Sequence, residues 1–84
     1  MTIIDIDLLK ENADIVRQFG NHVFARTADL VSVYEVLTYE KYEPKTLKDL
    51  DTTYMIANGT TWDELADRFF GEPTMPRFDK ILNN

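Results

Sequence analysis

Apolar side chains recur every three or four positions over residues 7–19, which is the spacing of one helix face. The residues on that face are Leu8, Leu9, Ala13, Val16 and Phe19. Asp7 can cap the first turn, and Gly20-Asn21 marks the end because both residues tolerate a positive φ. The sequence therefore predicts a helix over 7–19, within an N-terminal helical extension that covers residues 1–30.

Residues 31–42 are dense in β-branched and aromatic side chains, and this composition favours a strand. A helix that starts at Thr27 is the alternative, because several apolar residues of the same stretch also fit one helix face. Those residues are Leu30, Val33, Tyr34 and Leu37. We expect the strand, which Pro44 ends.

The most distinct pattern in the chain is a helix that begins after Thr61. Thr61 and Glu64 have the spacing of a capping box, in which each side chain bonds a free backbone donor of the first turn. Gly71 ends the helix, and Pro73 prevents its continuation. The apolar stripe of this helix is formed by Trp62, Leu65, Ala66, Phe69 and Phe70.

Shorter elements flank that helix on both sides. The polar segment 44–51 is interpreted as a connector, and 52–56 as a short strand closed by the turn dipeptide Asn58-Gly59. Pro76 suits the first position of a second short helix. The inward-facing residues of that second helix are expected to be Phe78, Ile81 and Leu82.

The charge of the chain narrows the classes of partner. Its 84 residues hold 15 Asp and Glu against nine Lys and Arg, a net charge of −6. Phosphate backbones and anionic membranes repel such a surface, so we expect neither nucleic acid nor membrane as a partner. A chain of this length has a thin core, and a protein partner is expected to supply part of its stability.

The residue types also limit the chemistry. The chain has no cysteine and one histidine, which excludes thiolate metal sites and a site built from several imidazoles, so no metal or cofactor is expected. Asp63 and Asp67 lie four apart but opposite the apolar stripe, where carboxylates are solvated. His22 and Ser32 lack the nucleophile elbow of a hydrolase. We therefore expect no catalytic residue and no enzymatic activity.

The start of the chain has no basic region, and acidic residues stand where a secretory signal has its apolar core. No apolar stretch approaches the roughly 20 residues that span a bilayer. The sequence thus predicts no signal peptide and no membrane-spanning segment.

Residues 54–71 resemble a LysM module. Tyr54 lies in the opening strand, Gly59-Thr60-Thr61 stands for the turn, Leu65-Ala66 for the helix pair and Phe69 for the aromatic one turn later. Ile81-Leu82-Asn83 is similar to the ending of the second helix of that module. The resemblance implies an α+β fold: a small LysM-like domain with a strand-helix-helix core and an additional strand, preceded by the N-terminal helix. The domain would cover residues 31–84 and lack its last strand.

The stretch Phe70-Gly71-Glu72-Pro73-Thr74 is similar to the Tyr-Gly-Asp-Pro-Thr of LysM-like tail and baseplate proteins of contractile phages. These include the tail protein X type and the small baseplate wedge proteins of T-even-like phages. The resemblance implies a structural subunit of a phage tail, a baseplate or a related contractile injection machine, located in the virion and assembled in host cytoplasm. Its partners would be other tail or baseplate subunits in a symmetric multi-copy assembly.

Several side chains are candidates for such an interface, and the tyrosines among them have hydroxyls that need water or a partner. They are Tyr34, Tyr39, Tyr42, Met75 and Phe78. Two other functions stay open. A LysM module binds peptidoglycan or chitin, although half of that groove is missing here. An acidic phage-encoded inhibitor that imitates nucleic acid is the other alternative.

Overall fold

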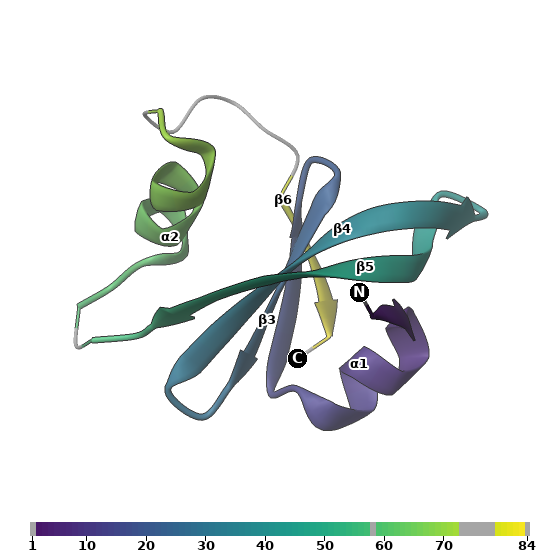
Figure 1. Ribbon diagram of the computed structural model, residues 1–84, viewed down its shortest axis with the longest axis horizontal. Helices are drawn as coiled ribbons and strands as arrows, with labels where there is room; N and C mark the ends of the chain where they lie inside the picture. The colour runs from purple at the N-terminus through teal and green to yellow at the C-terminus, as the bar shows by residue number, and fades with distance from the viewer. Residues whose placement is uncertain (1, 58, 73–78, 84) are drawn as a thin grey trace.

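The computed structural model describes residues 2–57, 59–72 and 79–83. These residues form one antiparallel sheet of six strands, in the order β1-β5-β4-β3-β2-β6, and two helices (Figure 1). The elements in chain order are β1 (Ile3–Asp5), α1 (Ile6–Asn12), β2 (Ile15–Phe19), β3 (His22–Thr27), β4 (Leu30–Glu40), β5 (Glu43–Met55), α2 (Trp62–Phe70) and β6 (Asp79–Asn83). The strands alternate their side chains between two faces, and each face has its own apolar cluster.

The first cluster lies between α1 and the sheet. It joins residues of that helix to side chains of four strands, and Leu47 on β5 is fully buried in it. The buried members are Ile6, Leu9, Ala13, Val16, Val23, Ala25, Val36 and Leu47. Ile6 and Leu9 belong to this cluster, so α1 has to lie against the sheet directly after β1 ends.

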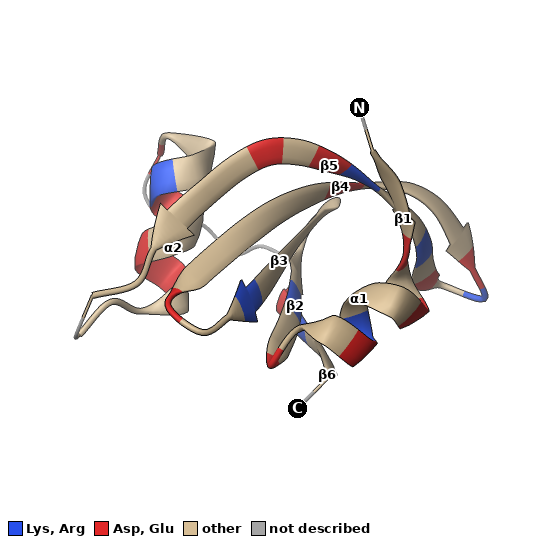
Figure 2. Ribbon diagram, turned by 60° about the horizontal axis from the view of Figure 1, so that its bottom comes forward, with Lys and Arg blue, Asp and Glu red and all other residues tan. Residues whose placement is uncertain are grey.

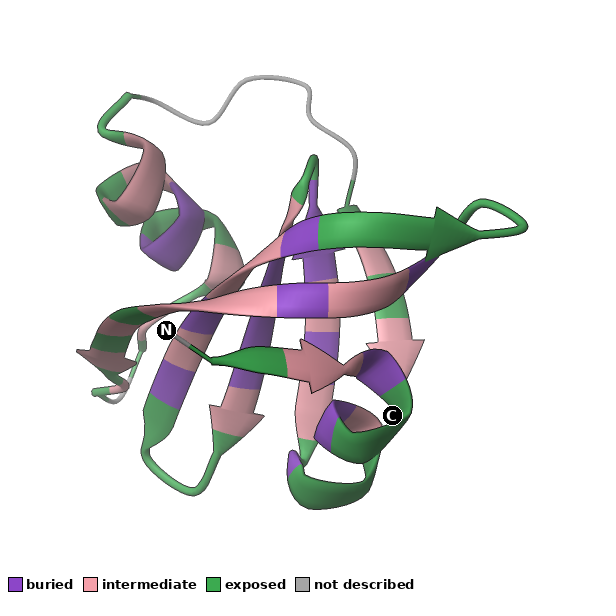
Figure 3. Cartoon of the chain, turned by 45° about the vertical axis from the view of Figure 1, so that its right-hand side comes forward, coloured by how far each residue is buried: buried purple, intermediate pink, exposed green. Residues whose placement is uncertain are grey.

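The second cluster lies on the opposite face, where α2 packs. Leu65 and Ala66 of α2 are buried against strand residues that include Phe19 and Phe24, whose rings meet edge to face with centroids 5.2 Å apart. Partly buried side chains surround this contact: Leu50, Tyr54, Ile56, Trp62, Phe69 and Phe70. The central strands are therefore covered on both sides, as the burial colours show (Figure 3).

The sheet twists so that the long β4–β5 hairpin crosses over β2 and β3 (Figure 1). Twist also brings β6 back toward the start of β5, where Lys80 pairs with Glu43. At the other end of β6, the amide of Asn83 donates a 2.8 Å hydrogen bond to the carbonyl oxygen of Lys10 on α1. The two edges of the sheet thus approach each other on the side that α1 occupies.

The predicted LysM-like α+β fold is wrong, because the described residues form a mostly β structure and not a strand-helix-helix core. Residues on both sides of position 30 belong to the same sheet, since β2 pairs with β3 before that position and with β6 after it. The sequence predicted no strand after the second helix, but the chain has one there: β6, which pairs with β2 from the first part of the chain.

The helix predicted over 7–19 is present only in its first half, and its second half is wrong. The N-cap is Asp5, whose carboxylate accepts a hydrogen bond from the backbone N–H of Asp7, and the helix ends at Asn12. Residues Ile15–Phe19 form β2, in which Val16 and Gln18 are buried on one face and Phe19 on the other. Both faces of β2 are covered, so apolar side chains point to both of them. Their positions in the sequence therefore matched the spacing of one helix face.

Two further elements differ from the prediction. The supposed connector 44–51 lies within β5, and the part of the second helix that the structure describes is the strand β6. The strand prediction for 31–42 is confirmed as β4, which pairs with β5 so that Val31 is opposite Tyr54. The helix after Thr61 is confirmed with both ends: Thr61 Oγ1 accepts from Glu64 N at 3.1 Å, and Gly71 has a φ of 73°.

Candidate binding surface on the β4–β5 hairpin

The β4–β5 hairpin extends beyond the part of the sheet that the helices cover. We call residues 37–45 the arm; it follows Val36, the last buried residue of β4, and ends before β1 begins to pair at Thr46. Leu37 is 43% exposed, Tyr39 49% and Tyr42 94%. Large apolar side chains that project together from a β-hairpin are typical of a binding surface.

The root of the arm is fixed to the β2–β3 turn. Val36 N donates to the carbonyl of Asn21 at 2.9 Å, and the hydroxyl of Tyr39 donates to Asn21 Oδ1 at 2.8 Å. The side-chain amide of the buried Gln18 approaches the same hydroxyl at 3.4 Å. These contacts hold the lower part of the arm, so Tyr39 presents its ring in a defined orientation.

The tip of the arm is a two-residue turn, Lys41-Tyr42, between the opposed residues Glu40 and Glu43. Both central residues have positive φ, 54° for Lys41 and 69° for Tyr42. Asn and Gly favour this conformation, whereas residues with long side chains are strained in it. A strained backbone that displays an almost fully exposed tyrosine is consistent with a surface retained for binding.

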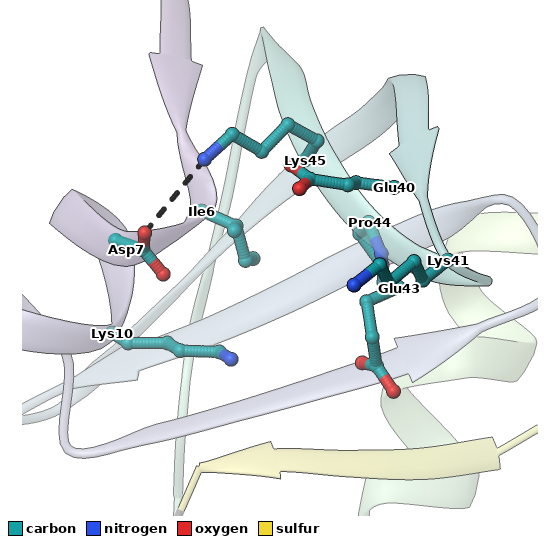
Figure 4. Close-up of a pocket in the computed structure, with 8 residues that line it drawn as sticks. All are labelled: Ile6, Asp7, Lys10, Glu40, Lys41, Glu43, Pro44 and Lys45. Atoms are coloured by element: carbon teal, nitrogen blue, oxygen red, sulfur yellow. Dashed lines mark ion pairs between the residues drawn. The ribbon is translucent and has the colours of Figure 1, made fainter.

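A hollow of about 320 Å³ lies between the arm and α1, with Ile6 and Pro44 among its apolar walls and six charged side chains around them (Figure 4). Lys45 lies 3.3 Å from a carboxylate oxygen of Asp5 and 3.8 Å from one of Asp7. The Asp5 hydrogen bond raises the pKa of Lys45. The pKa of Asp5 is lowered, first by the backbone N–H of Asp7 and then by Lys45.

Two other lysines of the hollow, Lys10 and Lys41, form no ion pair with any described residue. Their ammonium groups point into the hollow from α1 and from the arm (Figure 4). A second, open hollow of about 600 Å³ lies on the other side of Lys41 and is lined by Tyr39, Lys41 and Tyr42. The arm therefore offers aromatic rings beside ammonium groups that can pair with carboxylates of a partner.

Comparison with known proteins does not add to this geometry. The chain matches no family model, no curated protein and no solved structure. The described residues contain no helix long and apolar enough to cross a membrane, and no group of three metal-ligating side chains. The surface must be interpreted from its own chemistry.

The structure separates the five interface candidates of the sequence. Tyr39 and Tyr42 lie on the arm, whereas Tyr34 packs against the α1 cluster, where burial raises the pKa of its hydroxyl. Met75 and Phe78 lie outside the described residues. Sequence reasoning missed Leu37 and the lysines of the arm, because the turn Lys41-Tyr42 contains neither Gly nor Asn to mark a hairpin.

The residues assigned to the LysM-like motif have structural positions around α2 and β6. Thr61 and Gly71 cap the helix, Gly59 has a φ of 86°, and Pro73 lies outside the described residues. Ile81 is exposed on β6, and Leu82 packs against the α1 cluster. The remaining members, Tyr54, Trp62, Leu65, Ala66, Phe69 and Phe70, form or surround the second cluster.

The polar candidates for chemistry also lie within packed structure. The ring of His22 meets those of Phe69 and Phe70 edge to face at 5.0 and 5.4 Å, and burial lowers its pKa. Ser32 is opposite Ala25, three positions along β3 from His22. The two side chains therefore occupy different places on the sheet, and they form no nucleophile–base pair.

Proposed function

We propose that this chain is a non-enzymatic interaction module that binds another protein through the arm. The observation that carries the proposal is the exposure of Leu37, Tyr39 and Tyr42 on one projecting hairpin whose root is fixed by hydrogen bonds to the β2–β3 turn. Rigid aromatic side chains lose little conformational entropy when a partner covers them, and they are enriched at interface hot spots.

The lysines of the arm support a protein partner over the other classes. The ammonium groups of Lys41 and Lys10 can pair with carboxylates of a protein partner. The chain as a whole has a net charge of −6 and repels polyanions. An inhibitor that imitates nucleic acid would need its acidic groups gathered on its binding face, whereas the arm holds Glu40 and Glu43 beside two lysines and has no net charge. Glycan binding would depend on the LysM groove, and the six-stranded sheet does not provide that arrangement.

We further propose the setting that the sequence resemblance implies, a phage tail, a baseplate or a related contractile machine in which the chain contacts neighbouring subunits. This part of the proposal rests on the stretch Phe70–Thr74 and on the capped helix α2 that precedes it.

Site-specific photocrosslinking in cells that produce the chain tests the proposal. Benzoylphenylalanine at position 42 is expected to give a light-dependent adduct of defined mass with a protein. The matched control carries the same group at position 8, because Leu8 is an exposed apolar residue of α1 that does not line either hollow. Equal adduct formation at positions 42 and 8, or none at 42, would contradict a binding role for the arm.

A further inference from the structure

One polar side chain lies buried among the apolar residues of the sheet. Among the residues that the structure describes, Gln18 is the only buried polar one, and 3% of it is exposed. It lies two positions after Val16 on β2, so it points to the face of the sheet that α1 covers. Its carboxamide oxygen accepts no hydrogen bond from a described residue. Such an amide lowers the free energy of unfolding, and this cost indicates that the side chain does something other than fill the core.

The amide of Gln18 connects the β2–β3 turn to the arm. Its Nε2 donates to the carbonyl oxygen of Gly20 at 2.9 Å and lies 3.4 Å from the hydroxyl oxygen of Tyr39. That hydroxyl donates in turn to Oδ1 of Asn21 at 2.8 Å. The directions agree, because an amide nitrogen has two hydrogens and a hydroxyl can accept one bond while it donates another. Gln18, Tyr39 and Asn21 therefore form a chain of hydrogen bonds whose members strengthen one another.

The backbone pairing of the arm is interrupted at the point where the arm begins. The register of β4 against β5 shifts twice, between Val36 and Thr38 and between Thr38 and Tyr39. Pro44, opposite Tyr39, has no N–H to donate. No residue of the arm belongs to either apolar cluster, and charged residues of both signs lie along the projecting hairpin (Figure 2). Neither regular pairing nor apolar packing therefore fixes the direction in which the arm projects.

We infer that Gln18 and Asn21 are positioning residues of the arm, which hold the hydroxyl of Tyr39 and so fix the hairpin in its binding orientation before a partner arrives. The inference rests on the proposed function, because it says how the same surface is kept ready to bind. Without these bonds the ring and the hairpin would have to be ordered during binding, and the cost of that ordering would be subtracted from the affinity. Neither residue needs to contact the partner, since both act through Tyr39.

Backbone amide relaxation, measured by NMR on the purified chain, tests whether the arm is held in this way. Gln18→Met removes the amide but keeps an unbranched side chain of similar size, and Tyr39→Phe removes only the hydroxyl. The order parameters of residues 37–40 are expected to be about 0.85 in the unmodified chain and to fall below about 0.6 in both variants. Tyr42→Phe is the matched control, because Tyr42 is 94% exposed and the loss of its hydroxyl should leave the order parameters unchanged.

A purely structural role of Gln18 predicts a different pattern. If the amide only supports the β2–β3 turn, Gln18→Met changes the order of residues 19–22 and leaves that of residues 37–40 unchanged. That result would overturn the inference, as would a Tyr39→Phe variant whose arm is as ordered as that of the unmodified chain. The melting midpoint of Gln18→Met is expected not to fall, because apolar burial replaces that of an amide and the carbonyl of the exposed Gly20 can bond water.

Photocrosslinking relates the order of the arm to binding. With benzoylphenylalanine at position 42, Gln18→Met and Tyr39→Phe are each expected to reduce the yield of adduct by about two- to tenfold, which corresponds to the cost of ordering one side chain. Benzoylphenylalanine at position 39 itself lacks the hydroxyl, so its adduct is expected at a lower yield than the adduct at position 42. An unchanged yield at position 42 in a variant whose arm has loosened would overturn the inference.

Failure of the proposed function gives a different result. If the unmodified chain forms no adduct at position 42, the arm is not a binding surface, whereas the relaxation data still show whether Gln18 and Asn21 fix it. If every variant forms the adduct at position 42 with equal yield, the arm binds a partner but these two residues do not position it.

Discussion

The two halves of the β4–β5 ribbon share one backbone arrangement but differ in what covers them. In the half that contains Val31, Val33 and Leu47, α1 and α2 cover opposite faces and these side chains are fully buried. In the other half, residues 37–45, neither described helix reaches the tip, and Tyr42 is almost fully exposed. The position of the helices, and not the strand pairing, therefore separates the core of this protein from its candidate binding surface.

The comparison has a physical consequence for mutation. Apolar side chains in the covered half contribute to folding stability through burial, whereas those of the arm contribute little in the free protein and gain their burial only in a complex. Substitutions in the covered half should therefore lower the free energy of unfolding, whereas substitutions in the arm should weaken binding of a partner.

The largest effect is expected for Phe24→Ala in the covered half. Phe24 is fully buried between Phe19 and α2, and removing its ring should lower the free energy of unfolding by about 3–5 kcal/mol. Tyr42→Ser on the arm should change it by less than about 0.5 kcal/mol. Urea unfolding of both variants measures the contrast, and a similar loss for both would show that the arm is part of the core.

A smaller loss is expected at the start of α2. Thr61→Ala removes the hydroxyl that accepts from Glu64 N and should cost about 0.5–2 kcal/mol of unfolding free energy. Thr61→Ser keeps the hydroxyl and is the matched control, with a loss close to zero. If Thr61→Ser and Thr61→Ala lower the urea midpoint equally, the cap does not stabilise the helix that covers this half of the ribbon.

The elements that the sequence predicted correctly are those whose signals are local. The helix Trp62–Phe70 has its cap, its stripe and its Gly71 stop within eleven residues, and all three are present in the structure. β4 was predicted from its β-branched composition. In each case neighbouring residues contain the information, so no distant contact was needed.

The errors occur where distant segments decide the structure. β2 has Gln18 buried among apolar residues, with its amide bonded to the carbonyl of Gly20, so its alternation was hidden. β6 is a strand because β2, more than 60 positions earlier in the chain, supplies its partner, an arrangement fixed in part by the pairing of Arg17 with Asp79. The arm was half predicted: Tyr39 and Tyr42 were named, but their projection depends on where α1 and α2 end.

The turn of the arm should show a gain in stability at the expense of binding. Tyr42→Gly relieves a positive φ that a tyrosine adopts with strain, and it should raise the free energy of unfolding by up to about 1 kcal/mol. The same change removes an exposed ring and should weaken adduct formation by benzoylphenylalanine placed at position 39. Tyr42→Ala is the control, because it removes the ring and keeps the strain. A Tyr42→Gly variant that is no more stable than Tyr42→Ala would show that the turn is not strained.

The smallest expected effect is a dependence of α2 packing on pH. Burial beside Phe69 and Phe70 lowers the pKa of His22 below 6.5, with Glu35 across the strand pair opposing the shift. The folded state therefore prefers the neutral ring, and this contribution to stability is complete above pH 6.5 and is lost as the pH falls from 6.5 through the folded pKa. His22→Gln does not titrate in this range.

Melting curves of both proteins between pH 7.5 and 5 test this sign. The midpoint of the unmodified chain should fall more than that of His22→Gln, while carboxylate titration affects both alike. A larger fall for His22→Gln would mean that protonation of His22 strengthens the fold through Glu35.

The central claim, that the exposed half of the ribbon is the binding surface, is tested most directly by photocrosslinking in cells with benzoylphenylalanine placed, in separate experiments, at positions 37, 39, 42 and 8. We expect adducts with the same protein from the three arm positions, whose side chains are exposed, and none from position 8 on α1. Adducts of equal yield at position 8, or no adduct from any arm position, would contradict the account.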